Sequence, residues 1–238
     1  MPESSYARQV TSPLRAVGGE LLGSALLTTV VVGSGIAAQQ LSTDTGLRLL
    51  ENALVTALGL TVLILVFAPV SGAHFNPIVT LVDALLGRRR WRQVFGYLPA
   101  QIAGCIAGAI LANAMFELPA VTLSTTDRAT LPHLLAETVA TAGLVLVIFA
   151  LVRSGRATLV APAVGAYIGA AYFFTSSTSF ANPAITVGRM FSDTFAGIAP
   201  SSVPPYVAAQ LVGGVLGALA VRAFVPAPAA PAPEDLRP

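Results

Sequence analysis

Six apolar runs set the strongest limit on how this chain can fold. Each run has about 20 residues or more, which is enough for a helix to cross the hydrocarbon core of a bilayer. With 55% hydrophobic and only 10% charged residues, the chain has too little polar surface to cover a soluble globule. The sequence therefore predicts an all-α membrane protein with six transmembrane helices. The runs are residues 14–37, 49–69, 93–116, 133–152, 157–176 and 203–225.

The distribution of arginine predicts the orientation. With the N-terminus in the cytoplasm, ten arginines fall on the cytoplasmic side, and only Arg48 and Arg128 fall in outer loops. We therefore expect a multi-pass protein of the cell (plasma or inner) membrane, with both termini cytoplasmic. All thirteen basic residues are arginine, a composition typical of a bacterial genome rich in G and C. Residues 1–13 form a cytoplasmic segment in this interpretation, and 226–238 a Pro-rich disordered cytoplasmic tail.

Two Asn-Pro dipeptides, Asn76-Pro77 and Asn182-Pro183, each follow an apolar run. Asn is a preferred N-cap and Pro is favoured at the first helical position, so a helix should begin at each proline. The first of these helices has about ten residues before Gly87, a length that reaches about half-way across the hydrocarbon core. The orientation places the two segments on opposite faces of the membrane. The sequence therefore predicts two re-entrant half-helices.

The chain carries an internal repeat. Three landmarks recur in the same order, namely an intramembrane glutamate, the Asn-Pro dipeptide and a Y-x-x-A-Q-x-x-G pattern. Because each half holds three spans, the second half must lie upside down in the membrane. The predicted membrane domain is 14–225, with halves 14–116 and 133–225. The landmarks are Glu20, Asn76 and Gln101 in one half and Glu137, Asn182 and Gln210 in the other.

Two half-helices inside a membrane imply a buried junction or a pore. The reason is that irregular backbone at membrane depth is tolerated only where it packs within the protein or lines a water-filled cavity. Their N-termini should meet near the midplane, where the two helix dipoles give a positive potential that repels cations and protons. Asn76 and Asn182 can each cap a helix and also present an amide N–H to the lumen. The predicted cargo is small, neutral and hydrogen-bonding.

These motifs resemble those of the aquaporin, or major intrinsic protein, family over residues 14–225. The segments that carry the resemblance are SGAHFNP, FANPA and the repeated glutamate and Y-x-x-A-Q-x-x-G patterns. The resemblance implies a right-handed bundle of six helices with two half-helices, assembled as a homotetramer in which every subunit holds its own pore. Its pore motifs are Asn76, Pro77 and Ile78, where Ile78 replaces the usual alanine, and Asn182, Pro183 and Ala184.

The resemblance also indicates four residues of an outer selectivity filter. They are Thr56, Ala170 (to within one residue), Ser179 and Ile185. Ile185 stands where the family usually has arginine, but Arg189 lies one turn further along and could lean back toward the junction. In that case Asp193, four residues after Arg189, could hold the guanidinium in place. The alternative is that Arg189 does not face the pore but extends its side chain to the outer membrane interface.

The small residues Thr56 and Ala170 predict a wide pore without an aromatic wall. The aromatic residues Tyr97 and Tyr172 are expected in interfacial belts instead, together with Trp91. We therefore expect water and small neutral solutes to pass, with glycerol-like polyols and metalloid hydroxides such as arsenite as further cargo.

Glu20 and Glu137 have two interpretations. The resemblance makes them acceptors that hold backbone N–H groups of the re-entrant loops, whereas intramembrane carboxylates are also typical of a proton-coupled secondary transporter. His74 either packs within its loop or acts as a gate that responds to pH.

The sequence offers no catalytic site. It contains no Ser-His-Asp set, phosphate loop or metal-ligand cluster, and only two histidines, far apart. We predict a protein that is not an enzyme, needs no cofactor or metal and binds no nucleic acid. We expect the arginines at 88–92 to interact instead with the negative C-terminal end of a helix dipole and with anionic lipid.

Overall fold

The computed structural model describes residues 12–226, and in this part six helices are long and apolar enough to cross a membrane. This confirms the predicted all-α fold with six spans. Of the predicted terminal segments, residues 1–11 and 227–238 lie outside the described part. The long helices are α1 (Pro13–Leu41), α2 (Thr45–Ser71), α4 (Trp91–Met115), α5 (Leu131–Arg153), α6 (Val160–Phe174) and α8 (Val203–Phe224), with short 3-10 turns at Ala157–Leu159 and Pro200–Ser202.

Two short helices, α3 (Pro77–Leu85) and α7 (Pro183–Arg189), begin at the predicted prolines. Each is capped by the asparagine before it. The side-chain oxygen of Asn76 accepts from the Ile78 N–H at 2.9 Å, and that of Asn182 from the Ala184 N–H at 3.0 Å.

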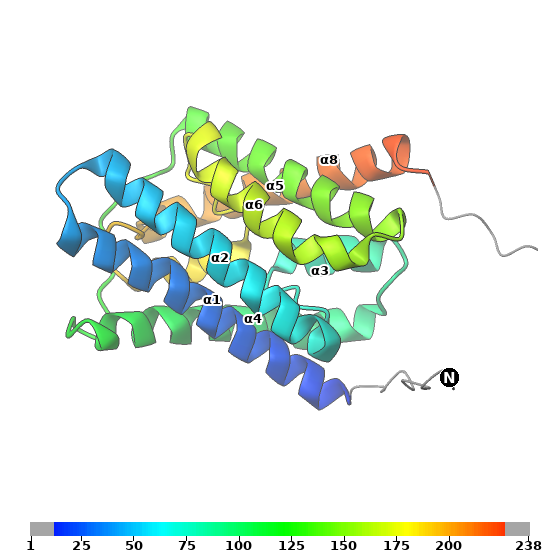
Figure 1. Cartoon of the computed structure of the whole chain (residues 1–238), viewed down its shortest axis with the longest axis horizontal. Coiled ribbons are helices and arrows are strands. Elements are labelled where there is room, and N and C mark those ends of the chain that lie inside the picture. The colour runs from blue at the N-terminus through cyan, green and yellow to red at the C-terminus, as the bar shows by residue number, and fades with distance from the viewer. Residues whose placement is uncertain (1–11, 227–238) are drawn as a thin grey trace, which may run out of the picture.

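The two repeats have equivalent packing. Helix α1 packs against α4 and against α2, and in the second half α5 packs against α8 and α6. Figure 1 shows the long helices side by side along the long axis, with the start of α1 and the end of α8 at the same end of the bundle. An even number of crossings requires this placement of the two ends.

Small residues allow the helices within each repeat to approach closely. A Cβ added at Gly108 of α4 would lie 2.1 Å from the Ala25 carbonyl oxygen of α1, and one at Gly213 of α8 would lie 2.5 Å from the Thr138 oxygen of α5. Both distances are impossible for a real side chain, so these contacts require glycine.

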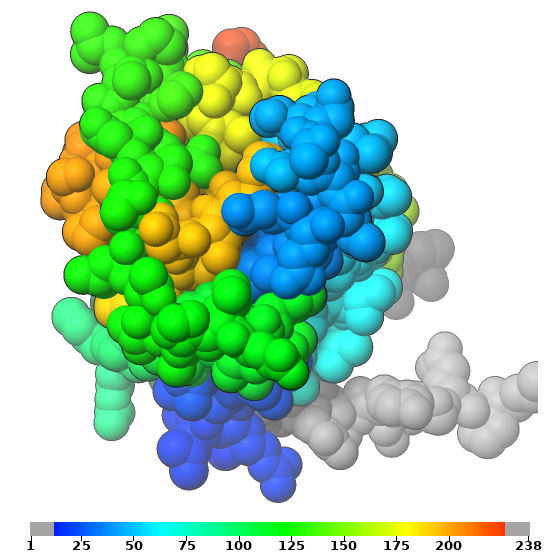
Figure 2. All heavy atoms as spheres, turned by 90° about the vertical axis from the view of Figure 1, so that its left-hand side faces the viewer, coloured from blue at the N-terminus to red at the C-terminus, as the bar shows by residue number. Residues whose placement is uncertain are grey.

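The connection between the repeats, residues 116–130, is extended and covers one end of the bundle. It hydrogen-bonds to the segment after α7, because the Ser124 N–H donates to the Met190 carbonyl at 2.9 Å and the Ala199 N–H to the Thr126 carbonyl at 2.7 Å. Figure 2 views this end and shows the connection (green) against the residues that follow α7 (orange-yellow).

Candidate functional site: a cavity between the two half-helices

The N-termini of α3 and α7 meet through crossed hydrogen bonds. The Asn76 side-chain amide donates to the Ala181 carbonyl at 2.8 Å, and the Asn182 amide donates to the Phe75 carbonyl, also at 2.8 Å. A side-chain amide has two N–H groups, so each asparagine keeps one donor beyond this bond. Both residues line a cavity, so the remaining donors are available to a molecule inside it.

A buried carboxylate holds the loop before α3. Glu20 Oε1 accepts from the His74 N–H at 3.0 Å, and Oε2 accepts from the Phe75 N–H at 2.7 Å. The Gln101 amide donates both to Glu20 at 2.7 Å and to the Thr80 hydroxyl at 2.9 Å. The Thr80 hydroxyl in turn donates to the carbonyl of the capping asparagine.

The second repeat copies this network. Glu137 accepts from the N–H groups of Phe180 and Ala181 at 2.8 and 2.9 Å. The Gln210 amide donates to Glu137 at 2.7 Å and to the Thr186 hydroxyl at 2.9 Å. Sequence reasoning missed the two threonines. A signal for them was present in the sequence, since each threonine lies four residues after its asparagine.

The carboxylates also hold a strained backbone. Ala73, Phe75, Ser179 and Ala181 all have φ between 47° and 50°, a left-handed conformation that costs roughly 1–2 kcal/mol for a residue other than glycine. The strain turns successive N–H groups toward one acceptor, an arrangement that suits an anion. Neither Glu20 nor Glu137 lines the cavity, and every one of their four carboxylate oxygens accepts hydrogen bonds. This geometry agrees with the loop-holding role and leaves neither Glu20 nor Glu137 with a free carboxylate oxygen in the cavity.

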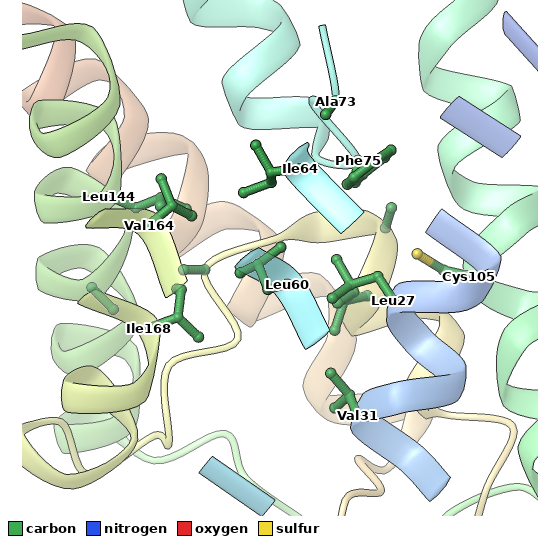
Figure 3. Close-up of a cluster of buried hydrophobic side chains, with 14 of the residues drawn as sticks. Leu27, Val31, Leu60, Ile64, Ala73, Phe75, Cys105, Leu144, Val164 and Ile168 are labelled. Atoms are coloured by element: carbon green, nitrogen blue, oxygen red, sulfur yellow. The ribbon is translucent and has the colours of Figure 1, made fainter. Parts of the chain in front are cut away.

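The cavity has a volume of about 500 Å³ and an apolar middle section. Figure 3 shows side chains that converge on it from several helices, with Leu27 and Val31 opposite Leu144 and Ile168. An apolar wall cannot replace the water around an ion, so an ion would lose hydration without compensation.

Arg189 lies at one end of the cavity, in a group that we call the Arg189 mouth. Its side chain is buried, with 2% exposed, and its guanidinium carbon lies 3.4 Å from the centre of the Phe180 ring. Its Nε donates to the Ala196 carbonyl. Arg189 therefore faces the cavity, and the snorkelling alternative is wrong. The Arg189 mouth comprises Thr56, Tyr172, Ser179, Phe180 and Arg189.

Two predictions for this mouth need correction. Ala170 is exposed on the outside of α6 and does not line the cavity, whereas Tyr172, two residues later, does. The Tyr172 hydroxyl lies 3.2 Å from the Thr56 hydroxyl. Because the helix turns by 100° per residue, an error of two residues moves a side chain to the opposite face. The mouth therefore has aromatic walls, and the expectation of a pore without an aromatic wall is wrong.

Asp193 does not hold Arg189. The helix α7 ends at Arg189, so the i+4 spacing no longer applies, and the Asp193 carboxylate instead accepts from the Thr125 N–H at 2.9 Å. Ile185 lines the cavity, as expected. Ile78, in contrast, packs in an apolar cluster with Val145 and does not line the cavity, so its extra bulk fills a helix interface.

A second arginine supports the Arg189 mouth from the connection between the repeats. Arg128 donates to the Phe195 and Gly197 carbonyls at 3.1 and 2.7 Å, on either side of the carbonyl that Arg189 uses. Burial lowers the pKa of Arg128 from its ordinary value. Next to it, hydrogen bonds from the Ser202 hydroxyl and the Ala129 N–H lower the pKa of Asp127.

The opposite end of the cavity, which we call the His74 mouth, carries several charged groups. His74 is one of its lining residues, and its Nδ1 lies 3.0 Å from the Thr80 hydroxyl. Its Nε2 lies 3.2 Å from an Arg89 guanidinium nitrogen and 3.5 Å from an Asp83 oxygen. Tyr97, expected at an interface, is buried beside His74. The His74 mouth comprises Gly72, His74, Asp83, Arg88 and Arg89.

Comparison with known proteins identifies the family. The family model described as "Major intrinsic protein" matches residues 7–180. The aquaglyceroporin AqpS of Rhizobium meliloti (strain 1021) is 48% identical over 212 residues, which cover 89% of this chain and 90% of the relative. Aquaporin NIP1-3 of Oryza sativa subsp. japonica is 32% identical over 210 residues, 84% of this chain and 70% of the relative.

The fold has a counterpart among solved structures. The aquaglyceroporin from Plasmodium falciparum aligns with a TM-score of 0.72 at 19% identity, over 90% of this chain and 97% of that chain. The repeat, the capped half-helices and the relatives agree, and the chain belongs to the major intrinsic protein family of membrane channels.

Proposed function

We propose that this protein is a passive channel that conducts water and small neutral solutes such as glycerol, and that it excludes protons and other ions. One observation carries the proposal: two asparagines, each with a spare N–H donor, line a cavity at the point where two helix N-termini meet. The donors can orient an oxygen of a passing molecule, and the helix dipoles oppose cations.

The mixed lining of the cavity supports solutes that are larger than water. A polyol presents hydroxyls along one side and C–H groups along the other, which suits a cavity lined both by asparagine donors and by apolar side chains such as Leu144 and Ile168. Undissociated arsenite offers hydroxyls of similar spacing, so we include metalloid hydroxides in the proposed cargo. The relative from Rhizobium meliloti is named an aquaglyceroporin, which supports a polyol substrate.

In the proposed orientation the His74 mouth faces the cytoplasm and the Arg189 mouth faces outward, in the plasma or inner membrane. The arginines beside the His74 mouth and at the cytoplasmic ends of the helices support this choice. We propose a homotetramer with one cavity per subunit. The leucines on the outward face of α2, such as Leu50, Leu54 and Leu58, are exposed in a single chain and are available for contact with lipid or a neighbour.

Stopped-flow light scattering of proteoliposomes tests the channel. An impermeant osmolyte should cause faster shrinkage than in protein-free vesicles, and glycerol should re-enter faster. Neither rate should saturate with solute or depend on a proton gradient. Saturation together with dependence on the gradient would contradict the proposal and favour a coupled transporter. Arsenite uptake equal to that of protein-free vesicles would remove the metalloid cargo alone.

A further inference from the structure

Asp83 and Arg189 occupy equivalent positions in the two half-helices. Each lies seven residues after its capping asparagine, and each lines the cavity near one of its ends. The inverted repeat therefore places a carboxylate at the His74 mouth where the other mouth has a guanidinium. A lone carboxylate there would attract cations into the cavity, which a channel for neutral solutes must avoid.

Arg89 neutralises this carboxylate. Its Nε lies 3.0 Å from Asp83 Oδ2, and only 13% of its side chain is exposed. Arg88 also contacts Asp83, at 3.4 Å, but 46% of its side chain is exposed, so solvent screens that pair. Of the two arginines, Arg89 is therefore the one that is built into the wall of the cavity.

Three further contacts fix the Arg89 guanidinium. One terminal nitrogen lies 3.3 Å from the Ser71 carbonyl oxygen and 3.2 Å from His74 Nε2, and the guanidinium carbon lies 4.5 Å from the centre of the Tyr97 ring. An arginine can only donate, so His74 Nε2 accepts, and its Nδ1–H faces the Thr80 hydroxyl. His74 is thus neutral in this arrangement and positions the arginine.

The two mouths share a design that their sequences do not reveal. Arg189 lies over the Phe180 ring and donates to a backbone carbonyl. Arg89 lies over the Tyr97 ring and donates to a backbone carbonyl. His74 and Phe180 themselves occupy equivalent positions, two residues before each asparagine. Arg89 reaches the His74 mouth from the connection after α3, whereas Arg189 belongs to the half-helix α7 itself.

We propose that Arg89 is a second specificity-determining residue, which filters solutes at the His74 mouth as we expect Arg189 to do at the other end. The proposal rests on the proposed channel function. A guanidinium that is fixed in the wall holds water through its remaining N–H donors. A polyol must displace that water to pass, whereas another water molecule simply replaces it. Arg89 therefore favours water over polyols.

A matched pair of variants tests this role in proteoliposomes. Arg89→Ala should raise the ratio of glycerol to water permeability by about two- to tenfold, the range expected for one hydrogen bond. Arg90→Ala is the control, because Arg90 is the adjacent arginine, is exposed and does not line the cavity. Equal ratios in the two variants, with native flux well above protein-free vesicles, would overturn the second filter alone. Native flux equal to protein-free vesicles would overturn the channel itself and the filter with it.

A chemical rescue separates charge from bulk and from misfolding. Arg89→Cys is treated with a methanethiosulfonate that adds an aminoethyl group, or with one that adds a propyl group of the same length. The native Cys105 is buried, with 0% exposed, so the untreated and treated parent proteins should behave alike. We expect the aminoethyl adduct to restore the native ratio and the propyl adduct to leave it high. Restoration by both adducts, or by neither, would overturn the proposal.

Discussion

Replacing Glu137 by glutamine tests whether buried carboxylates hold the re-entrant loops. Glu137→Gln preserves the shape of the side chain but exchanges one acceptor oxygen for a donating amide. In the native structure Oε1 accepts from the Phe180 N–H, while Oε2 accepts from the Ala181 N–H and the Gln210 amide. Whichever way the new amide turns, at least one of these donors loses its acceptor.

The expected loss of stability follows from these contacts. The least costly orientation leaves the Phe180 N–H unsatisfied, at about 1–3 kcal/mol, and the two bonds that remain each lose about 1 kcal/mol of charge assistance. The lower desolvation cost of a neutral amide offsets part of this sum. We expect a net loss of about 3 kcal/mol, which lowers the unfolding midpoint by about 9 °C for a chain of this size.

Glu20→Gln should cost at least as much. Glu20 accepts one more hydrogen bond, from the Ser71 hydroxyl at 2.6 Å, so its oxygens face two donors each. Either orientation of the new amide then opposes two donors rather than one.

The lone cysteine supplies the assay. Cys105 is fully buried, so a fluorogenic thiol dye reacts with it only as the protein unfolds. The midpoint of the fluorescence rise on heating measures stability in detergent or lipid. Glu117→Gln is the control, since Glu117 is exposed in the connection between the repeats. A Glu137→Gln midpoint equal to that of the control would refute the reasoning.

Three further predictions concern the cavity and its supports. Arg189→Ala should raise glycerol permeability relative to water severalfold in stopped-flow measurements. Asp193→Asn should not, because Asp193 contacts the connection between the repeats and not Arg189. Equal effects of the two substitutions would contradict the placement of Arg189 in the cavity wall. Ile78→Ala should lose about 2–4 kcal/mol of stability by the thiol-dye assay, yet keep the native ratio of glycerol to water, and a changed ratio would place Ile78 in the pore. Gly188→Ala should lower both stability and water flux, because its Cβ would lie 2.6 Å from the Cys105 carbonyl oxygen; native behaviour would show that α7 can shift freely.

Much of the fold could be predicted because strong local signals repeat. Apolar length predicted the six spans, and Asn-Pro predicted the starts of both half-helices to the residue. Glu20 and Glu137 stood out because a buried carboxylate needs donors, and the loops supply them.

The side-chain geometry at the mouths could not be predicted in the same way. Counting along α6 from a family spacing selected Ala170, but helical phase decides which residue faces the cavity, and that residue is Tyr172. The pairing of Asp83 with Arg89 depends on how the chain turns after α3, and no spacing rule for helices covers that turn.

The central claim is tested most directly by following water and protons in the same vesicles. Proteoliposomes that contain a trapped pH-sensitive dye are mixed with an impermeant osmolyte, and then with a pH jump, while scattering and fluorescence are recorded together. The account predicts that shrinkage is much faster than in protein-free vesicles while the internal pH relaxes at the protein-free rate. Shrinkage no faster than in protein-free vesicles, or pH relaxation accelerated along with it, would contradict a channel that passes neutral molecules and excludes protons.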